Sequence, residues 1–235
     1  MPKRLLVIAF AVLLTSGCAV SVTGKPVAGP APVAPSENPK TAVTTSGDAK
    51  PAVRCTFAED ISPGAVAVDG RPTGTPDGAG GTLTFTTDKG VLKIELDPLA
   101  GPCSVQSVRF LVRKKFYDGT SCHRLTINPS LGVLQCGDPS GTGTGTPGYQ
   151  YDDKLPVRGA YQRGIVAMAN AGPGTNGSQF FIVHGAAQID PAYPVVGKVV
   201  AGMEIVDKIV AGGVAGGAED GKPATPLKFT TVTGG

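Results

Sequence analysis

The chain has 235 residues, with 21 Lys or Arg, 18 Asp or Glu and a formal net charge of +3. This near balance excludes the concentrated positive surface that nucleic-acid binding requires. The part of the chain beyond about residue 80 is long enough for one domain with its own hydrophobic core.

Residues 1–18 have the pattern of an export signal. Lys3 and Arg4 precede the apolar run Leu5–Leu14, which is too short to span a bilayer, and Thr15-Ser-Gly-Cys18 follows. This ending is similar to the lipobox of bacterial lipoproteins, in which the cysteine is diacylated. An ordinary cleaved signal peptide and a buried apolar strand are the alternatives. We expect an exported, extracytoplasmic protein that is anchored to the cell membrane by lipid on Cys18.

The next two segments do not have the pattern of a packed domain. Residues 19–50 are mostly Pro, Ala, Thr, Val, Ser and Gly without a hydrophobic period, which predicts a flexible, disordered linker. Residues 51–81 remain rich in Gly, Pro and Asp but contain Cys55 and Phe57, and we interpret them as an extended arm. Residues 82–235 are the expected globular domain.

The domain begins with a predicted β-hairpin and contains two predicted helices. Two alternating apolar runs within Thr82–Asp97 flank Asp88-Lys89-Gly90, a hairpin pattern. The segments Cys103–Lys115 and Gly202–Val210 have helical spacing of apolar residues. Several further short apolar runs predict strands. The pattern is typical of a mainly β fold, a barrel or sandwich with helical plugs.

Several kinds of chemistry are unsupported by the sequence. His123 and His184 are the two histidines, and neither belongs to a metal-binding motif. Ser178 lacks the surroundings of a nucleophile elbow. The loop Gly137–Gly148 contains a G-x-G-x-x-G, but Tyr149–Pro156 has no helical period, so a phosphate site is not expected. We expect no cofactor and no metal.

Two stretches of the sequence are long and distinctive enough to indicate a protein family. FYDGTSCHR at Phe116–Arg124 leads to Gln135-Cys-Gly-Asp138, and MANAGPGTNGSQFFI occupies Met168–Ile182. In this order they closely resemble the motifs of the cyclophilin peptidyl-prolyl cis-trans isomerases, a resemblance that extends from Thr82 to the C-terminus. It implies a closed eight-stranded antiparallel β-barrel capped by two α-helices, with the loop Gly137–Gly148 beside a groove that binds proline-containing peptides and folding proteins.

The resemblance also implies the site residues. Arg124 matches the catalytic arginine and Gln135 the glutamine that orders it. A guanidinium against the prolyl nitrogen stabilises the twisted peptide bond more than either planar form, so neither a nucleophile nor a metal is needed. The matching substrate contacts are Val133, Ala169, Asn170, Gln179, Phe181, Ile189 and Tyr193. His123 is interpreted as structural.

Three departures from the family pattern stand out. Residues 127–131 are an insertion between Arg124 and Gln135, and Gly132 stands where an aromatic pocket residue is expected. Either Leu131 fills that space or the pocket is weaker. Gln188 stands where cyclosporin-sensitive members carry tryptophan. We predict an exported, monomeric isomerase, and the alternative is a catalytically weak proline-peptide binding module or chaperone.

Four cysteines remain besides Cys18, an even number that favours disulfides in an exported chain. Three pairings are possible. Cys122 and Cys136 would lie on paired strands that flank the insertion, so we favour a bridge between them. Cys55 and Cys103 would then join the arm to the first helix.

Overall fold

A computed structural model of the chain describes residues 53–235. The predicted signal peptide, the candidate lipidation site Cys18, the predicted linker and the first two residues of the predicted arm lie outside the described residues. Among residues 53–235, no helix combines the length and the apolar character needed to cross a membrane.

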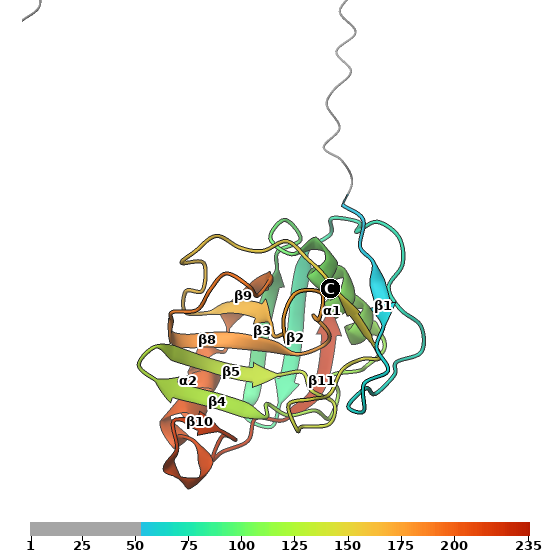
Figure 1. Cartoon of the computed structure of the whole chain (residues 1–235). Coiled ribbons are helices and arrows are strands. Elements are labelled where there is room, and N and C mark those ends of the chain that lie inside the picture. The colour runs from blue at the N-terminus through green and yellow to red at the C-terminus, as the bar shows by residue number, and fades with distance from the viewer. Residues whose placement is uncertain (1–52) are drawn as a thin grey trace, which may run out of the picture. The chain divides into compact units, whose positions relative to one another are not determined.

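The domain is built on one antiparallel sheet, which is shown in Figure 1. Nine strands follow the order β10-β4-β5-β8-β7-β9-β3-β2-β11, and β1 pairs with β6 in a separate two-stranded sheet. The strands are β1 (Phe57–Glu59), β2 (Gly81–Thr87), β3 (Gly90–Leu96), β4 (Arg124–Asn128), β5 (Leu131–Cys136), β6 (Tyr149–Tyr151), β7 (Ile165–Met168), β8 (Phe180–Ala187), β9 (Val195–Ala201), β10 (Asp220–Gly221) and β11 (Phe229–Gly234). The hairpin predicted over Thr82–Asp97 is confirmed as β2 and β3.

Alternating side chains fill the space that the sheet encloses. In β2, Leu83 and Phe85 are buried while the residues between and beside them are more exposed, as the two-residue period of a strand requires. The sheet curls, so that β4, β5 and β8 cross over β2, β3 and β11 (Figure 1). The ring of Phe85 therefore meets Phe180 of β8 at 5.9 Å and Phe229 of β11 at 4.9 Å.

The expected closed, eight-stranded barrel is wrong: the sheet has nine strands and is open, with β10 and β11 as its edges. The sheet stays open because of the segment that follows the second predicted helix. It places β10 along the outer edge of β4, with Asp220 opposite Thr126, so β11 cannot pair there. Before β4 begins, an isolated bridge between Ser121 and Lys228 and three backbone hydrogen bonds join residues 119–122 to residues 227–229 across the opening.

Both predicted helices are confirmed, with slightly different ends. α1 spans Pro102–Arg113, and its first residue is a proline, which suits a position without a helical N–H partner. α2 spans Met203–Gly212, and the short 3-10 helix η1 (Ala215–Gly217) follows it. Each α-helix turns one apolar face toward the core; in α2 this face is Ile205, Val206 and Ile209.

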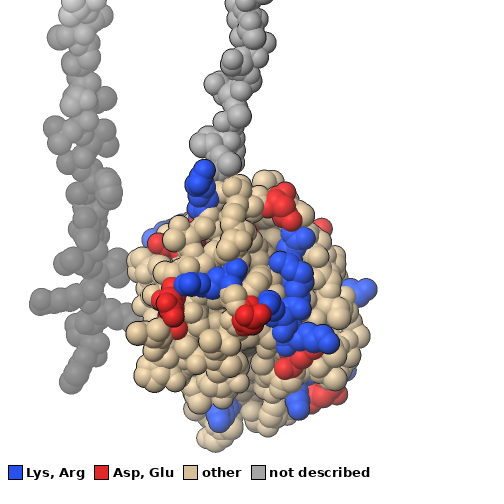
Figure 2. Space-filling model, turned by 90° about the vertical axis from the view of Figure 1, so that its right-hand side faces the viewer, with Lys and Arg blue, Asp and Glu red and all other residues tan. Residues whose placement is uncertain are grey.

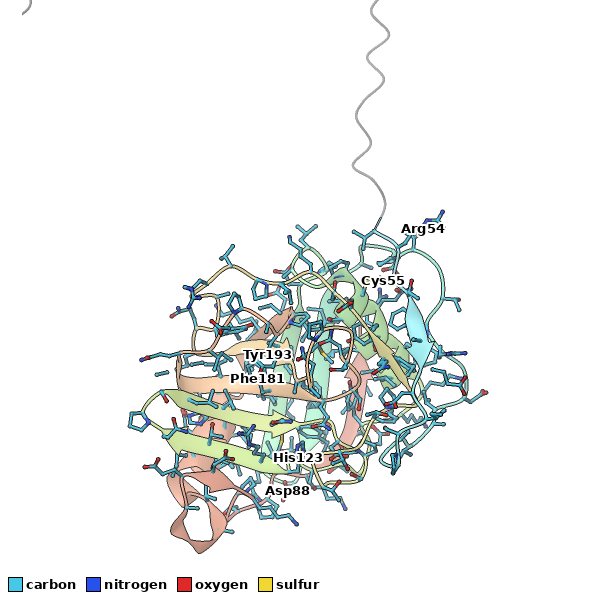
Figure 3. All side chains as sticks on the ribbon, viewed as in Figure 1. Arg54, Cys55, Asp88, His123, Phe181 and Tyr193 are labelled. Atoms are coloured by element: carbon cyan, nitrogen blue, oxygen red, sulfur yellow. A yellow bond between two sulfur atoms is a disulfide. The ribbon has the colours of Figure 1, made fainter. Side chains whose placement is uncertain are left out.

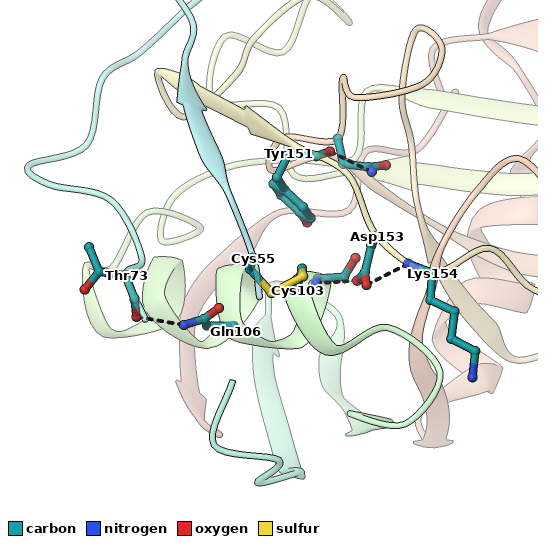
Figure 4. Close-up of a disulfide and its surroundings, with 9 residues drawn as sticks. Cys55, Thr73, Cys103, Gln106, Tyr151, Asp153 and Lys154 are labelled. Carbon is teal, nitrogen blue, oxygen red and sulfur yellow. Dashed lines mark hydrogen bonds between the residues drawn. A yellow bond between two sulfur atoms is a disulfide. The ribbon is translucent and has the colours of Figure 1, made fainter. Parts of the chain in front are cut away.

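The arm lies against the domain and is covalently tied to it. The predicted bridges Cys55–Cys103 and Cys122–Cys136 are both confirmed. Figure 4 shows the first at the beginning of α1, where the Gln106 side chain also donates to the carbonyl of Thr73 at 3.0 Å. β1 pairs with β6, and Phe57 packs at 5.5 Å on Tyr149.

Charged side chains add to the docking of the arm. The face in Figure 2 has basic and acidic groups close together. Arg109 of α1 donates to Asp77 at 2.8 Å, and Lys114 contacts Asp69 at 3.2 Å. Residues of the arm therefore form part of the folded surface.

Candidate functional site

The hairpin of β4 and β5 places Arg124 directly opposite Gln135. Directly opposed residues of an antiparallel pair project from the same face, and the Arg124 Nη1 donates to Gln135 Oε1 at 3.2 Å. Residues 127–131, the insertion inferred from the resemblance, lengthen this hairpin and form its turn. Asn128 Oδ1 closes the turn by accepting from the amides of Ser130 and Leu131 at 3.1 and 2.8 Å. The insertion thus leaves the pairing of Arg124 with Gln135 intact.

A pocket of about 150 Å³ opens beside the Arg124 side chain. A cavity of about this volume can hold a benzene-sized ring, so a proline ring fits the space. The structure gathers eight of the nine predicted site residues around it, together with Leu131. The lining residues are Arg124, Leu131, Val133, Gln135, Ala169, Asn170, Phe181, Ile189 and Tyr193.

Two aromatic rings, Phe181 and Tyr193, line the apolar side of this pocket, and a third packs against them. Phe181 of β8 is only 5% exposed and meets the Tyr193 ring edge to face at 5.6 Å; Figure 3 shows the two side by side. Tyr161 packs on Phe181 at 6.0 Å, and its hydroxyl donates to the Tyr193 carbonyl at 2.9 Å. These contacts restrain Tyr193, which lies in a loop, in its place at the rim.

Leu131 lines the pocket next to Gly132, the position where the resemblance implies an aromatic residue. Gly132 is buried between strands, and a Cβ added there would lie 2.9 Å from the Cα of Gly185. A side chain at position 132 is therefore excluded by the neighbouring backbone. Of the two alternatives from the sequence, the structure supports the first, because Leu131 lines the pocket.

Gln179 is the one predicted residue that lies outside this pocket, and it connects Gln135 to the glycine-rich loop. Gln135 Nε2 donates to Gln179 Oε1 at 2.8 Å. Gln179 Nε2 in turn donates to the carbonyls of Gly143 and Gly145 at 3.0 and 2.9 Å. The amide of Gln135 therefore has a fixed orientation, with its oxygen toward Arg124.

Asp138 organises the glycine-rich loop from inside. The carboxylate is almost fully buried and accepts from the amides of Ser140 and Gly143. Burial raises the pKa of Asp138, but the hydrogen bonds from Ser140, Gly143 and Gly145 outweigh it, so the pKa lies below its usual value. The carboxylate therefore stays ionised and holds the loop beside Gln179.

A second pocket of about 390 Å³ adjoins the first and shares Gln135, Ala169 and Asn170 with it. Asp60 and Ser62 of the arm line its far side. Cys55 and Phe57 indicate an arm, but no pattern in the sequence predicts that the arm reaches a groove next to Arg124.

Asp220 is the functional candidate that sequence reasoning missed. Its two carboxylate oxygens accept from Nε and Nη2 of Arg124, each at 2.7 Å. The hydrogen bond lowers the pKa of Asp220 and raises that of Arg124. The two residues are 96 positions apart, and only the pairing of β10 with β4 brings them together.

His123 lines neither pocket, although it is adjacent to Arg124 in the chain. Its imidazole is more than half buried, and burial lowers its pKa. In the part of the chain that the structure describes, no group of three His, Cys, Asp or Glu side chains could hold a metal ion.

Comparison with known proteins gives a consistent result. A family model described as cyclophilin type peptidyl-prolyl cis-trans isomerase/CLD matches residues 82–233. The probable peptidyl-prolyl cis-trans isomerase B of Mycobacterium tuberculosis is 46% identical over 164 residues, which cover 64% of this chain and 53% of that protein. The protein of the same name from Mycobacterium leprae is 42% identical, with 64% and 56% covered. The chain spans little more than half the length of these relatives.

Solved structures agree with the sequence relatives. The cyclophilin type peptidyl-prolyl cis-trans isomerase of Cryptosporidium parvum aligns with a TM-score of 0.58 at 28% identity, over 67% of this chain and 98% of that one. A second structure of that protein, obtained in the presence of the dipeptide Ala-Pro, aligns with a TM-score of 0.57 at 29% identity, over 65% and 97%. Because the family model covers more than half of its residues, this chain belongs to the cyclophilin-type peptidyl-prolyl cis-trans isomerase family.

Proposed function

We propose that this protein is a peptidyl-prolyl cis-trans isomerase that accelerates rotation about X-Pro bonds in proteins folding outside the cytoplasm. The observation that supports it most is the placement of the Arg124 guanidinium at the edge of an apolar pocket of about 150 Å³. Membership of the family and the Ala-Pro dipeptide used with the Cryptosporidium protein support the same substrate class.

The reaction needs a hydrogen-bond donor at the prolyl nitrogen and does not need a nucleophile. Rotation about an X-Pro bond faces a barrier of about 20 kcal/mol, so its spontaneous rate is on the order of 0.01 per second. Twisting the bond breaks amide resonance and returns a lone pair to the prolyl nitrogen. A guanidinium N–H aimed at that nitrogen is worth more in the twisted state than in either planar state, and one preorganised donor supplies roughly 3–4 kcal/mol.

The other lining residues hold the substrate. Phe181, Val133 and Leu131 would contact the proline ring, and their apolar surfaces exclude water from the rotating bond. Gln135, fixed by Gln179, would orient Arg124 on one side and offer its amide to the peptide on the other. A rate of about 1,000 per second needs about 7 kcal/mol in total, so the pocket would supply the part that Arg124 does not.

Replacement of Arg124 by alanine tests this mechanism. We expect kcat/KM to fall roughly 200- to 900-fold in a protease-coupled assay at 10 °C, where uncatalysed isomerisation takes minutes. Arg124→Lys should restore little of the lost kcat/KM, because the point charge of a lysine does not replace the planar guanidinium. Phe181→Ala is the comparison variant and should weaken peptide binding as well as turnover.

The same experiment separates the two candidate functions. A folded Arg124→Ala protein that isomerises at the parent rate would contradict the mechanism. A parent protein that binds proline peptides without turnover would favour the binding module or chaperone. A proline-limited refolding assay on a protein substrate would then distinguish these from an isomerase that acts only on whole proteins.

We further propose that the protein is exported and lipid-anchored at Cys18. The two disulfides support an oxidising, extracytoplasmic compartment, because such bonds are rare in the cytosol. Cys18→Ser should abolish acyl-dependent partition of the full chain into detergent. Unchanged partition would remove the basis for the anchor.

A further inference from the structure

We propose that Asp220 is a positioning residue for Arg124, a role that rests on the proposed isomerase function. It is inferred from the bidentate ion pair between the Asp220 carboxylate and the Arg124 guanidinium. Asp220 is not among the described residues that line this pocket, whereas Arg124 is. The Asp220 carboxylate would therefore hold the guanidinium of Arg124 without occupying the place of the substrate.

The backbone around Asp220 is itself fixed. β10 pairs with β4, which places Asp220 opposite Thr126 and Gly221 opposite Leu125. The amide of Ile127 donates to the carbonyl of Glu219 at 2.8 Å, directly before β10. On the far side of the loop, the amide of Ala215 donates to the carbonyl of Lys222 at 2.8 Å. The carboxylate is therefore carried on paired backbone along the strand that begins with Arg124.

The hydrogen bonds leave donors for a substrate. A guanidinium has five N–H groups. Asp220 accepts from Nε and Nη2, and Gln135 accepts from Nη1. Two N–H groups remain, one on each terminal nitrogen, and either could face a prolyl nitrogen in the pocket.

Asp220 is the stronger of the two restraints on Arg124. Its bonds are charge-assisted, bidentate and 2.7 Å long, whereas the single bond to the neutral Gln135 is 3.2 Å long. The Arg124 side chain is 40% exposed and has several rotatable bonds, so it would sample many orientations on the Gln135 bond alone.

The charge of Asp220 also has an effect that opposes this restraint. The negative charge of Asp220 reduces the positive field of Arg124 at the substrate. Because the Asp220 side chain is 49% exposed, solvent screens this effect, while the direction of the N–H groups depends on the bonds themselves. We therefore expect removal of Asp220 to slow the reaction.

The test is a set of four full-chain variants assayed for kcat and KM on a short X-Pro peptide. Asp220→Asn keeps the shape of the side chain but loses its charge and one acceptor. We expect kcat to fall about 3- to 10-fold with little change in KM. Glu219→Gln is the matched control, since it removes the neighbouring charge in the same loop and its side chain makes no hydrogen bond or ion pair within residues 53–235. It should leave kcat unchanged.

The double variant Arg124→Ala/Asp220→Asn separates positioning from a general effect on the fold. If Asp220 acts through Arg124, the second substitution adds nothing to the first. If Asp220 only stabilises β10, it lowers activity by the same factor in both backgrounds, and the proposal fails. It also fails if Asp220→Asn matches or exceeds the parent kcat. In contrast, an Arg124→Ala protein with parent activity would overturn the proposed function instead.

Discussion

The two disulfides should differ in how much they stabilise the fold. We consider two double variants, Cys122→Ala/Cys136→Ala and Cys55→Ala/Cys103→Ala. Alanine is preferred to serine because Cys103, Cys122 and Cys136 are buried, and a hydroxyl there would lack partners. Each variant loses two sulfur atoms, so the difference between the variants mainly reports the cross-link.

The size of the effect follows from the length of chain that each bridge closes. The separations are 14 residues for Cys122–Cys136 and 48 residues for Cys55–Cys103. In the chain-entropy model these loops correspond to about 3 and about 4 kcal/mol of stabilisation, a difference of about 1 kcal/mol. For a domain of this size, the thermal midpoint should fall by roughly 6–12 °C in the first variant and by roughly 8–16 °C in the second.

Urea unfolding measures both losses directly. The chain has no tryptophan and five tyrosines, so tyrosine fluorescence and far-UV circular dichroism are suitable probes. Because Arg124 and Gln135 are already paired through the backbone of β4 and β5, kcat/KM of the folded Cys122→Ala/Cys136→Ala protein should stay near the parent value. A larger loss of unfolding free energy in this variant than in the other would refute the loop-length reasoning.

Three further outcomes are expected. Among the described residues, Asp60 is the only charged one that lines the second pocket, so we expect the parent to prefer Lys over Glu near the proline and Asp60→Asn to reduce that preference. An unchanged ratio of the kcat/KM values for the two peptides would exclude a role for this carboxylate. Burial lowers the pKa of His123 and His184 in the folded protein. The contribution of the two neutral imidazoles to stability is therefore complete above about pH 6.5 and is lost as the pH falls through their folded pKa values. Urea midpoints that do not change between pH 7.5 and 5.5 would contradict this expectation. Gln188 offers no indole donor and little apolar area to cyclosporin, so titration should show weak binding, and nanomolar affinity would mean that its role is misassigned.

Short-range patterns in the sequence determined much of this protein. Alternating apolar residues around Asp88-Lys89-Gly90 predicted the hairpin of β2 and β3, and helical spacing predicted α1 and α2. These predictions succeed because hydrogen bonds within a hairpin or helix join residues close in the chain. The pocket residues could be named because the motifs around Arg124 and Phe181 are long and continuous, although their roles stay predictions.

Tertiary structure decided what depends on distant segments. The open sheet follows from β10, which pairs with β4 from about 95 residues away in the chain and carries Asp220 to Arg124. The arm reaches the groove through Asp60 for the same reason, since β1 pairs with β6. β10 is only two residues long, and its sequence Asp220-Gly221 has no alternating period. A strand of this kind forms because a neighbouring edge is free to accept it, and the sequence of the strand alone does not contain that information.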